Sequence, residues 1–371
     1  MKKNCLLIGI NAKYIHTNLA IRYLKAYCNK QYQSIALKEF SINDSLDNVL
    51  KEVYCKHTHV YAFSCYIWNI DRVLKLCSNL KKLNPDAVVV LGGPEVSFDA
   101  ETLITMHKYI DYIIRGEGEE TFLELLQLLK SDMHNNAEIL GLTYRLGNQI
   151  VSTPDRPLLQ NLDIIPFPYE DIKQLSNKII YYETSRGCPF NCQYCLSSTL
   201  HGVRYFSMDR IKQELKQFID LGVKQVKLVD RTFNCNKQHS LEIIKYIIKL
   251  QSKTNFHFEI GADLLDDEII AVLATAPKDM FQFEIGVQST NQIALREISR
   301  AMNIDKVKQN VLSLQQARNS HLHLDLIAGL PFEDFNSFGR SFDEVHQLLP
   351  DMLQLGFLKL LKGSGIRNRA K

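Results

Sequence analysis

The chain has 371 residues, of which 46% are hydrophobic and 23% charged, with a formal net charge of +3. This length suits two domains of ordinary globular composition. So small a charge gives no support to a nucleic-acid partner. No apolar run approaches the ~20 residues of a membrane-spanning helix, so we expect no membrane partner. Nine cysteines without a secretion signal indicate a reducing, cytoplasmic location, where clustered cysteines more often bind metal than form disulfides.

Residues 1–135 alternate short apolar segments with amphipathic ones. We expect strands at 4–10, 34–39, 58–63, 87–91 and 111–114. Helical patterns lie between them, for example at 19–28, 71–83 and 119–129. This α/β alternation predicts a parallel sheet covered on both faces, in a flavodoxin-like doubly wound domain. Ligands on such a fold bind beyond the carboxyl ends of the strands.

Residues 136–175 are expected to form a hairpin and a linker. The pair Gly147-Asn148, between two strand-like segments, is typical of a hairpin turn. The proline-punctuated stretch at 154–168 then predicts the connection between two domains.

From residue 176 onward the strand–helix alternation resumes. We expect strands at 179–184, 225–229, 256–261, 281–286, 322–327 and 353–358. Helices are expected near 208–221, 237–251, 266–275, 305–318 and 336–349. The pattern predicts a partial (β/α)6 barrel over 176–371, with its active site at the carboxyl ends of the strands.

Three cysteines lie within eight residues directly after the first expected barrel strand. Cys188, Cys192 and Cys195 are spaced C-x3-C-x2-C, and thiolates so arranged suit an iron–sulfur cluster. Three ligands cannot complete a four-iron cube, so one iron keeps the open position that a catalytic metal needs. A structural zinc site with His201 as fourth ligand, or three incidental cysteines, are the alternatives that the residues alone leave open.

The segment from Ser185 to Cys195, with Tyr194 before the third cysteine, resembles the cluster-binding loop of the radical SAM superfamily. The resemblance implies that Cys188, Cys192 and Cys195 bind a [4Fe–4S] cluster whose open iron takes S-adenosylmethionine. It also implies cleavage of that molecule to a 5′-deoxyadenosyl radical. An external donor such as flavodoxin or ferredoxin would supply the electrons.

Two later segments are similar to the S-adenosylmethionine contacts of that superfamily. The segment 284–289 resembles one that contacts the ribose and methionine parts, which implies cofactor-binding roles for Glu284, Gln288 and Ser289. The segment 325–331 resembles one that supports adenine, which implies such roles for Ile327 and Gly329. A glycine there would let the backbone approach the ring.

Asp230 lies in a segment that resembles a second-strand landmark of cobalamin-linked relatives, which implies a further cofactor contact. Both Asp230 and Glu284 also have an alternative, purely structural role. From the residues alone, either carboxylate could cap a helix or pair with Arg204 or Arg296.

Three loops of the first domain resemble those of cobalamin-binding domains. Their candidate residues are His16, Ser64 and the pair Gly92-Gly93. The resemblance implies that His16 binds cobalt, that Ser64 approaches the nucleotide tail, and that the glycines let this tail pass close to the backbone. The D-x-H-x-x-G motif is absent, because Tyr14 and Leu19 replace its aspartate and glycine, so a helix-capping or packing role for His16 stays open.

The single tryptophan, Trp68, is expected either to form a wall against the corrin or to lie in the core. Over nearly the whole chain, the resemblance is to an uncharacterised branch of the cobalamin-binding radical SAM proteins. It implies an enzyme with cobalamin-dependent chemistry, expected to be methyl transfer, on an unknown small-molecule substrate. The alternatives are a radical SAM enzyme without cobalamin and a non-catalytic iron–sulfur and cobalamin-binding protein. Because relatives continue past the barrel, we expect a carboxyl-terminal segment to be missing.

Overall fold

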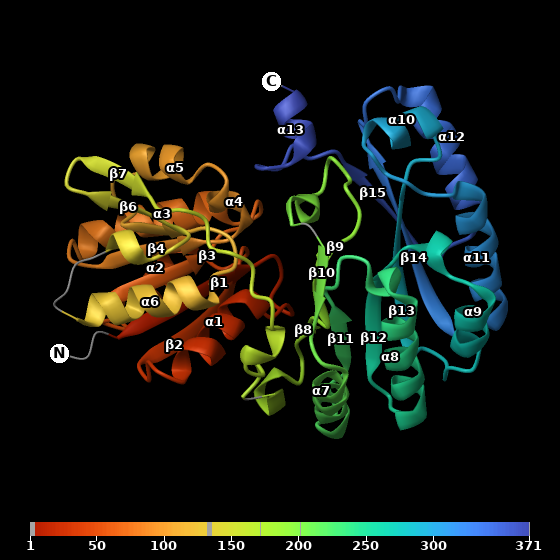
Figure 1. Ribbon diagram of the computed structural model, residues 1–371, viewed down its shortest axis with the longest axis horizontal. Coiled ribbons are helices and arrows are strands. Elements are labelled where there is room, and N and C mark those ends of the chain that lie inside the picture. Colours follow the sequence, from red (N-terminus) through yellow and green to blue (C-terminus); the bar gives the residue numbers. More distant parts are fainter. Residues whose placement is uncertain (1–3, 132–135, 171, 201, 371) are drawn as a thin grey trace. The chain divides into compact units, whose positions relative to one another are not determined.

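The computed structural model describes residues 4–131, 136–170, 172–200 and 202–370. The chain divides into two compact units, Met1–Glu170 and Asp171–Lys371, each with its own main sheet (Figure 1). Each unit is therefore described by itself.

The sheet of the first unit has the strand order β2-β1-β3-β4-β5-β6-β7. Its parallel strands are β1 (Cys5–Asn11), β2 (Ile35–Ser41), β3 (Val60–Ser64), β4 (Val88–Gly92) and β5 (Tyr112–Ile114). The order 2-1-3-4-5 is that of the flavodoxin-like doubly wound fold, which confirms the expected class. Every residue of β1 and β3 is buried, because helices cover both faces of the sheet.

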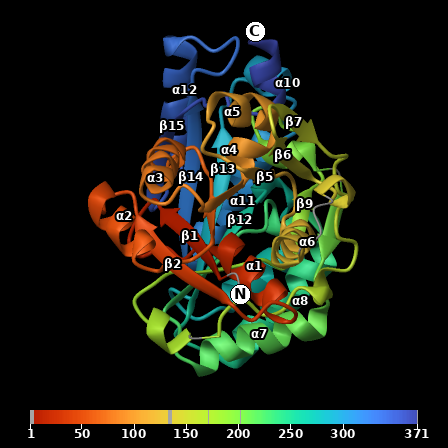
Figure 2. The same cartoon turned by 90° about the vertical axis from the view of Figure 1, so that its left-hand side faces the viewer.

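The helices of the first unit lie on two sides of this sheet (Figure 2). They are α1 (Leu19–Asn29), α2 (Leu46–Tyr54), α3 (Ile70–Leu83), α4 (Pro94–Ser97), α5 (Ala100–Met106) and α6 (Glu119–Lys130), with short 3-10 helices η1 (Asn136–Glu138) and η2 (Leu162–Ile164). Alternate residues of β1 feed two separate cores. Leu6 and Ile8 pack with α2, α3 and α5, whereas Cys5 and Leu7 pack with α1 and α6.

The hairpin after the first unit's parallel strands consists of β6 (Leu142–Leu146) and β7 (Gln149–Ser152). Gly147 in its turn has a φ of 58°, a value that favours glycine. Strand β6 also pairs antiparallel with β5, so the hairpin extends the first sheet. The sequence predicts the turn from local residues, but the partner strand is chosen by packing along the sheet edge.

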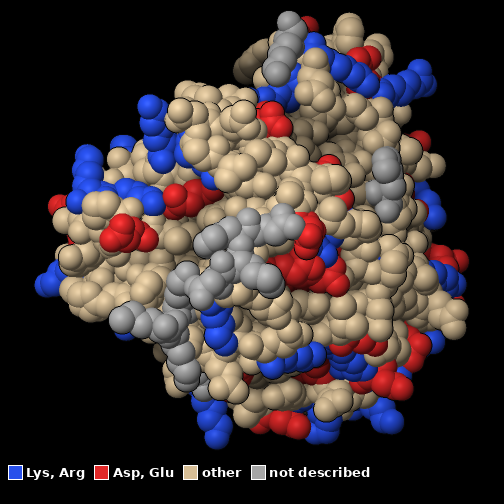
Figure 3. All heavy atoms as spheres, turned by 60° about the vertical axis from the view of Figure 1, so that its left-hand side comes forward, with Lys and Arg blue, Asp and Glu red and all other residues tan. Residues whose placement is uncertain are grey.

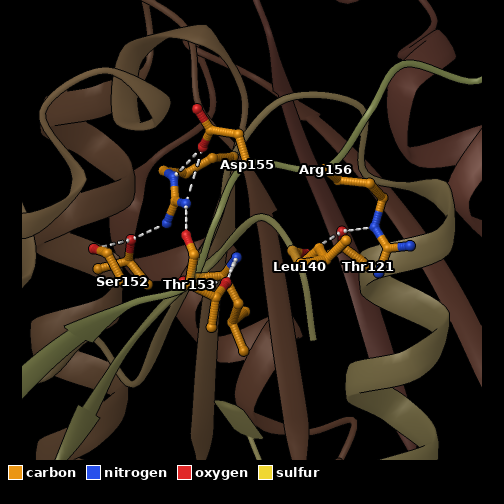
Figure 4. Close-up of polar contacts among 9 residues, drawn as sticks. Thr121, Leu140, Ser152, Thr153, Asp155 and Arg156 are labelled. Atoms are coloured by element: carbon orange, nitrogen blue, oxygen red, sulfur yellow. Dashed lines mark hydrogen bonds and ion pairs between the residues drawn. The ribbon is translucent and has the colours of Figure 1, made fainter. Parts of the chain in front are cut away.

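Two arginines hold the chain that follows this hairpin (Figure 4). Arg115 donates hydrogen bonds to three groups on or after the hairpin, which are the Thr143 hydroxyl, the Thr153 carbonyl and the Asp155 carboxylate. Arg156 donates to three groups of α6, which are the Thr121 hydroxyl and the carboxylates of Glu120 and Glu124. The segment is thereby fixed to both the sheet and a helix.

The second unit contains an open, all-parallel sheet in the order β15-β14-β13-β12-β11-β8. Its strands are β8 (Ile180–Tyr182), β11 (Gln225–Leu228), β12 (Asn255–Ile260), β13 (Phe281–Gln288), β14 (Ser320–Ala328) and β15 (Met352–Phe357). A separate antiparallel pair joins β9 (Ser185–Cys188) to β10 (Gly202–Tyr205). The strands fall where the alternation predicts them, in a sheet that stays open.

Helices follow the strands of this sheet as the pattern predicts. They are α7 (Met208–Asp220), α8 (Lys237–Leu250), α9 (Asp267–Ala274), α10 (Gln292–Glu297), α11 (Ile304–Ala317), α12 (Phe335–His346) and α13 (Gly365–Arg369), with 3-10 helices η3 (Ile172–Leu175), η4 (Leu196–Thr199), η5 (Phe233–Cys235) and η6 (Ala262–Leu264). The aromatic core includes Phe258, whose ring lies 5.6 Å from that of Phe281 and 6.0 Å from that of Phe283. The residues between these phenylalanines point to the opposite face and are polar.

Basic and acidic side chains lie next to one another over the lower part of the face shown in Figure 3. Within the described residues, no helix is both long enough and apolar enough to cross a bilayer.

Replacing Arg115 by lysine exchanges a planar fork with several donors for a point charge. We expect the free energy that protects residues 142–152 from opening to fall by about 1–3 kcal/mol, because buried acceptors lose their donors. Amide hydrogen exchange measures this. The control is Arg340→Lys, since Arg340 is exposed on α12 and its side chain forms no hydrogen bond within the described chain. Equal protection in Arg115→Lys and the wild type would mean that backbone pairing alone holds the hairpin.

Candidate functional site

The three cysteines lie on one loop beyond the carboxyl end of β8. Cys188 is the last residue of β9, and Cys195 precedes η4, where its Sγ accepts the backbone N–H of Ser197 at 3.4 Å. Cys192 is buried, and its carbonyl accepts the backbone N–H of Cys195 at 3.0 Å. All three are free thiols. The loop therefore offers three sulfur ligands at the edge of the sheet where the sequence predicts an active site.

A glycine fixes the start of this loop. Gly187 has a φ of 100°, and a Cβ on it would lie 2.1 Å from the carbonyl oxygen of Gly202 on β10. No side chain fits there, so the close pairing of β9 with β10 requires glycine at position 187.

Arg300 reaches the cysteine loop from a distant part of the chain. Its guanidinium donates to Cys192 Sγ at 3.7 Å, to Tyr194 Oη at 3.2 Å and to the Gly286 carbonyl. Burial raises the pKa of Cys192, Arg300 lowers it, and repulsion by Cys195 and Cys188 raises it again. Sequence reasoning missed Arg300, because it lies 108 residues from Cys192 and no local motif marks it.

No three His, Cys, Asp or Glu side chains in the described ranges converge on a point that could hold one metal ion. The alternative of a structural zinc site needs a fourth ligand in addition to the three cysteines. His201, the fourth ligand of that alternative, lies outside the described residues. In a four-iron cluster each cysteine binds a different iron, so its three sulfurs surround a larger object.

Asp230 follows β11 and is 1% exposed. Its two carboxylate oxygens accept the backbone N–H of Thr184 and the hydroxyls of Thr184 and Ser185. Burial raises its pKa, and these donors oppose the rise. Within the described residues, Asp230 thus neither caps a helix nor pairs with an arginine, and its oxygens accept hydrogen bonds from Thr184 and Ser185.

Glu284 lies in the middle of β13, on the polar face of the sheet. It accepts hydrogen bonds from Lys227 Nζ at 2.8 Å and from His257 Nε2 at 2.9 Å. Burial raises its pKa, but these two partners outweigh burial and hold it well below its usual range. These partners therefore lie on β11 and β12, and no bond to Arg296 is found within the described residues.

The end of β13 carries the two remaining polar candidates of that segment. Gln288 has a φ of 71° and is 9% exposed, and its Oε1 is buried without a hydrogen-bond partner in the described chain. Ser289 is buried, and its hydroxyl donates to Glu333 Oε1. Only Gln288 thus offers an unused acceptor.

Ile327 and Gly329 lie at the carboxyl end of β14. Ile327 is half-buried and aligns with Gly356 on β15. Gly329 has a φ of 87°, and a Cβ on it would meet no atom within 4 Å. The backbone here is accessible, as a close approach by a ligand would need.

Two further carboxylates lie on the polar face of the second sheet. Glu259 aligns with Glu284 on the next strand, and Asp325 aligns with Gly286. Burial raises the pKa of Glu259 to about 7 and also raises that of Asp325. Sequence reasoning missed Glu259 and gave Asp325 no role of its own within the segment 325–331, although polar residues at every second position of the expected strands were the available signal.

The loop after β1 holds His16 through its backbone. The His16 carbonyl accepts Asn11 Nδ2 at 2.9 Å, and its N–H donates to the Lys13 carbonyl at 3.2 Å. Asn18 caps α1 by accepting the N–H of Ile21, so capping is not the task of His16.

Ser64 and the two glycines lie at the carboxyl ends of neighbouring strands. Ser64 ends β3, aligns with Gly92, and its hydroxyl accepts Asn18 Nδ2 at 3.0 Å. Gly93 has a φ of 112°, and a Cβ on it would lie 2.6 Å from the Cys65 carbonyl oxygen. The structure thus brings Ser64, Gly92 and Gly93 together at one edge.

Trp68 lies on the loop after β3 and is 46% exposed, so it is not part of the core. Its ring stacks on Tyr66 at 4.4 Å, and its Nε1 donates to the Ile10 carbonyl at 3.3 Å. Tyr14, on the loop after β1, is 71% exposed. Both rings lie on loops that follow the carboxyl ends of adjacent strands, β3 and β1.

Replacing Gly93 by alanine forces a side chain into the left-handed region and against the Cys65 carbonyl. We expect the free energy of unfolding of the first unit to fall by about 2–4 kcal/mol, measured by denaturant titration. Gly92→Ala is the neighbouring control, because a Cβ there meets nothing closer than 3.8 Å. If both variants are equally stable, the close approach at Gly93 does not constrain the fold.

Two family models match the chain. The B12 binding domain matches residues 6–126, and the radical SAM superfamily matches residues 182–345. These segments correspond to the doubly wound unit and to the unit with the cysteine loop.

Curated relatives share this pair of domains. The chain is 26% identical over 360 residues to a cobalamin-dependent radical SAM methyltransferase of Streptomyces tokunonensis, covering 89% of this chain and 51% of the relative. It is 30% identical over 301 residues to 2-(S-pantetheinyl)-carbapenam-3-carboxylate methyltransferase of Streptantibioticus cattleyicolor, covering 75% and 43%. The chain thus spans about half the length of the curated relatives it matches.

A solved structure has the same fold. It is the radical S-adenosylmethionine methyltransferase TsrM of Kitasatospora setae, described with cobalamin and a [4Fe–4S] cluster bound, and it matches with a TM-score of 0.81 at 15% identity. The match covers 99% of this chain and 77% of that one. With a B12-binding domain followed by a radical SAM domain, the chain belongs to the cobalamin-binding radical SAM family.

Proposed function

We propose that the protein is a radical SAM enzyme that uses cobalamin to transfer a methyl group to a small-molecule substrate. The observation that carries this proposal is the loop with three free thiols, at the carboxyl edge of an open parallel sheet in a radical SAM domain. The two curated relatives are both named methyltransferases, which supports methyl transfer over other reactions. When bound, the cluster with S-adenosylmethionine supplies a carbon-centred radical and cobalamin supplies the methyl group.

Cys188, Cys192 and Cys195 are the residues that would hold a [4Fe–4S] cluster. The donor set fits, because thiolates are the ligands of such clusters and three of them leave one iron open. Arg300 suits this site, since its guanidinium hydrogen-bonds Cys192 Sγ and offsets negative charge on the sulfur.

Gln288, Ile327 and Gly329 would contact S-adenosylmethionine. Gln288 Oε1 is a buried acceptor without a partner in the described chain, which fits a ribose hydroxyl. Gly329 leaves its backbone open, and Ile327 next to it is apolar, which fits an adenine ring. Glu284, Ser289 and Asp230 are already bonded within the protein, so they would shape this site through other residues.

The edge formed by Ser64 and Gly92-Gly93 would receive cobalamin, with His16 and Trp68 on adjacent loops. The fit rests on the place of Ser64 and Gly92 at the carboxyl ends of neighbouring strands and on the exposed ring of Trp68. The chemistry further requires a low-potential electron donor, such as flavodoxin or ferredoxin. It also suits a reducing compartment, which we propose to be the cytoplasm.

The cluster assignment predicts that Cys192→Ala loses cluster and activity together. After anaerobic reconstitution, we expect the variant to lack the broad visible absorbance of the cluster and to release no 5′-deoxyadenosine. Cys55→Ala is the control, since Cys55 is an exposed thiol on the first unit. Full cleavage of S-adenosylmethionine by Cys192→Ala would refute the assignment.

The proposed cobalamin site at Ser64, Gly92-Gly93 and Trp68 predicts that the Trp68→Ala variant binds cobalamin about tenfold more weakly, because an aromatic contact is lost. Titration of the full chain with hydroxocobalamin, followed by its visible spectrum, measures the dissociation constant. Met106→Ala is the control, because Met106 is 71% exposed at the end of α5. A wild type that binds no corrin would instead favour a radical SAM enzyme without cobalamin.

A further inference from the structure

The carboxylate of Asp230 is buried without a counter-ion. It is 1% exposed, and no lysine, arginine or histidine forms an ion pair with it in the described part of the chain. Burying an ionised carboxylate is costly unless hydrogen bonds replace its water. The contacts of Asp230 must therefore account for its presence at the end of β11.

Three donors make four hydrogen bonds to Asp230, and they belong to two adjacent residues, Thr184 before β9 and Ser185 at its start. The Thr184 N–H lies 3.2 Å from Oδ1 and 3.0 Å from Oδ2, and the Thr184 hydroxyl lies 2.6 Å from Oδ1. The Ser185 hydroxyl also donates to Oδ1. Hydrogen bonds to a charged acceptor are shorter and stronger than neutral ones, so this set clamps both residues.

Ser185 begins the strand that ends at the first cysteine of the loop. Strand β9 has only four residues, Ser185–Cys188, and pairs with β10 through the glycine at 187. In so short a strand the position of its first residue sets that of its last. Fixing Ser185 therefore fixes where the Cys188 sulfur lies.

The segment after β11 also touches the cysteine directly. Thr232, two residues after Asp230, has its Oγ1 at 3.7 Å from Cys188 Sγ. The same hydroxyl donates to the Arg231 carbonyl at 2.8 Å, which holds its rotamer. The segment that follows β11 thus contacts both the first and the last residue of β9.

We infer that Asp230 is a positioning residue for the iron–sulfur cluster, which it serves by clamping Thr184 and Ser185 so that the Cys188 thiolate is held for the metal. The inference rests on the proposed cluster site, and it assigns Asp230 no contact with S-adenosylmethionine. Its effect passes through β9 to the ligand, as expected of groups that orient metal ligands from behind.

The test uses the full chain, reconstituted anaerobically with iron and sulfide. We expect Asp230→Ala to release iron to a ferrous chelator about tenfold faster than the wild type, since loss of such an orienting group weakens metal binding by that order. Asp230→Asn should fall between them, because its amide keeps one acceptor but presents N–H groups to the other donors. The electron paramagnetic resonance spectrum of the reduced cluster should change in both variants.

Glu214→Gln is the matched control for loss of a buried carboxylate. Glu214 is 6% exposed and accepts bonds from Tyr182 Oη at 2.7 Å and Arg210 Nε at 2.8 Å, and neither bond involves Thr184 or Ser185. We expect this variant to lower the melting temperature without changing iron release. If Asp230→Ala does not fold, Ser185→Ala, which removes one donor, should still speed iron release.

The outcomes separate the two proposals. A wild type that assembles a cluster, with Asp230→Ala or Ser185→Ala matching it in iron release and spectrum, overturns the positioning role and leaves the cluster site intact. A wild type that assembles no cluster overturns both.

Discussion

The alternation of side chains along parallel strands is the constraint on which the second unit depends. In β12 and β13 the phenylalanines point to the helices, so the residues between them must point to the opposite face. There His257, Glu259 and Glu284 gather beside Lys227. A barrel interior filled by branched apolar residues would be a packed core, whereas this polar face can hold ligands and protons.

Electrostatic pairing decides which of these polar groups are already engaged. Glu284 is held as an anion by Lys227 and His257, and Asp230 is satisfied by hydroxyl and amide donors. Glu259, with Lys227 Nζ no closer than 3.9 Å, has its pKa raised to about 7 by burial. A carboxylate such as Glu259, whose ion pair is long, is thus better suited to contact a ligand than one already bonded within the protein.

The first unit differs, because the carboxyl edge of its sheet carries glycine backbone and aromatic rings. Gly93 lies against Cys65 so closely that no side chain fits, and Ser64 is buried under Asn18. Trp68 is 46% exposed and stacks on Tyr66 at 4.4 Å. A rigid edge with exposed rings favours recognition of a flat ligand by shape.

The sequence by itself determined the order and kind of the elements, the hairpin turn at Gly147 and the cysteine spacing, because these depend on neighbours within a few residues. It also supported the family resemblance that the domain matches confirm. Only the tertiary structure decided which candidates are engaged within the protein. Asp230 meets Thr184 from 46 residues away, and Arg300 meets Cys192 from 108. Such pairs form because strands distant in the chain end at the same edge of a sheet, and no local pattern encodes them.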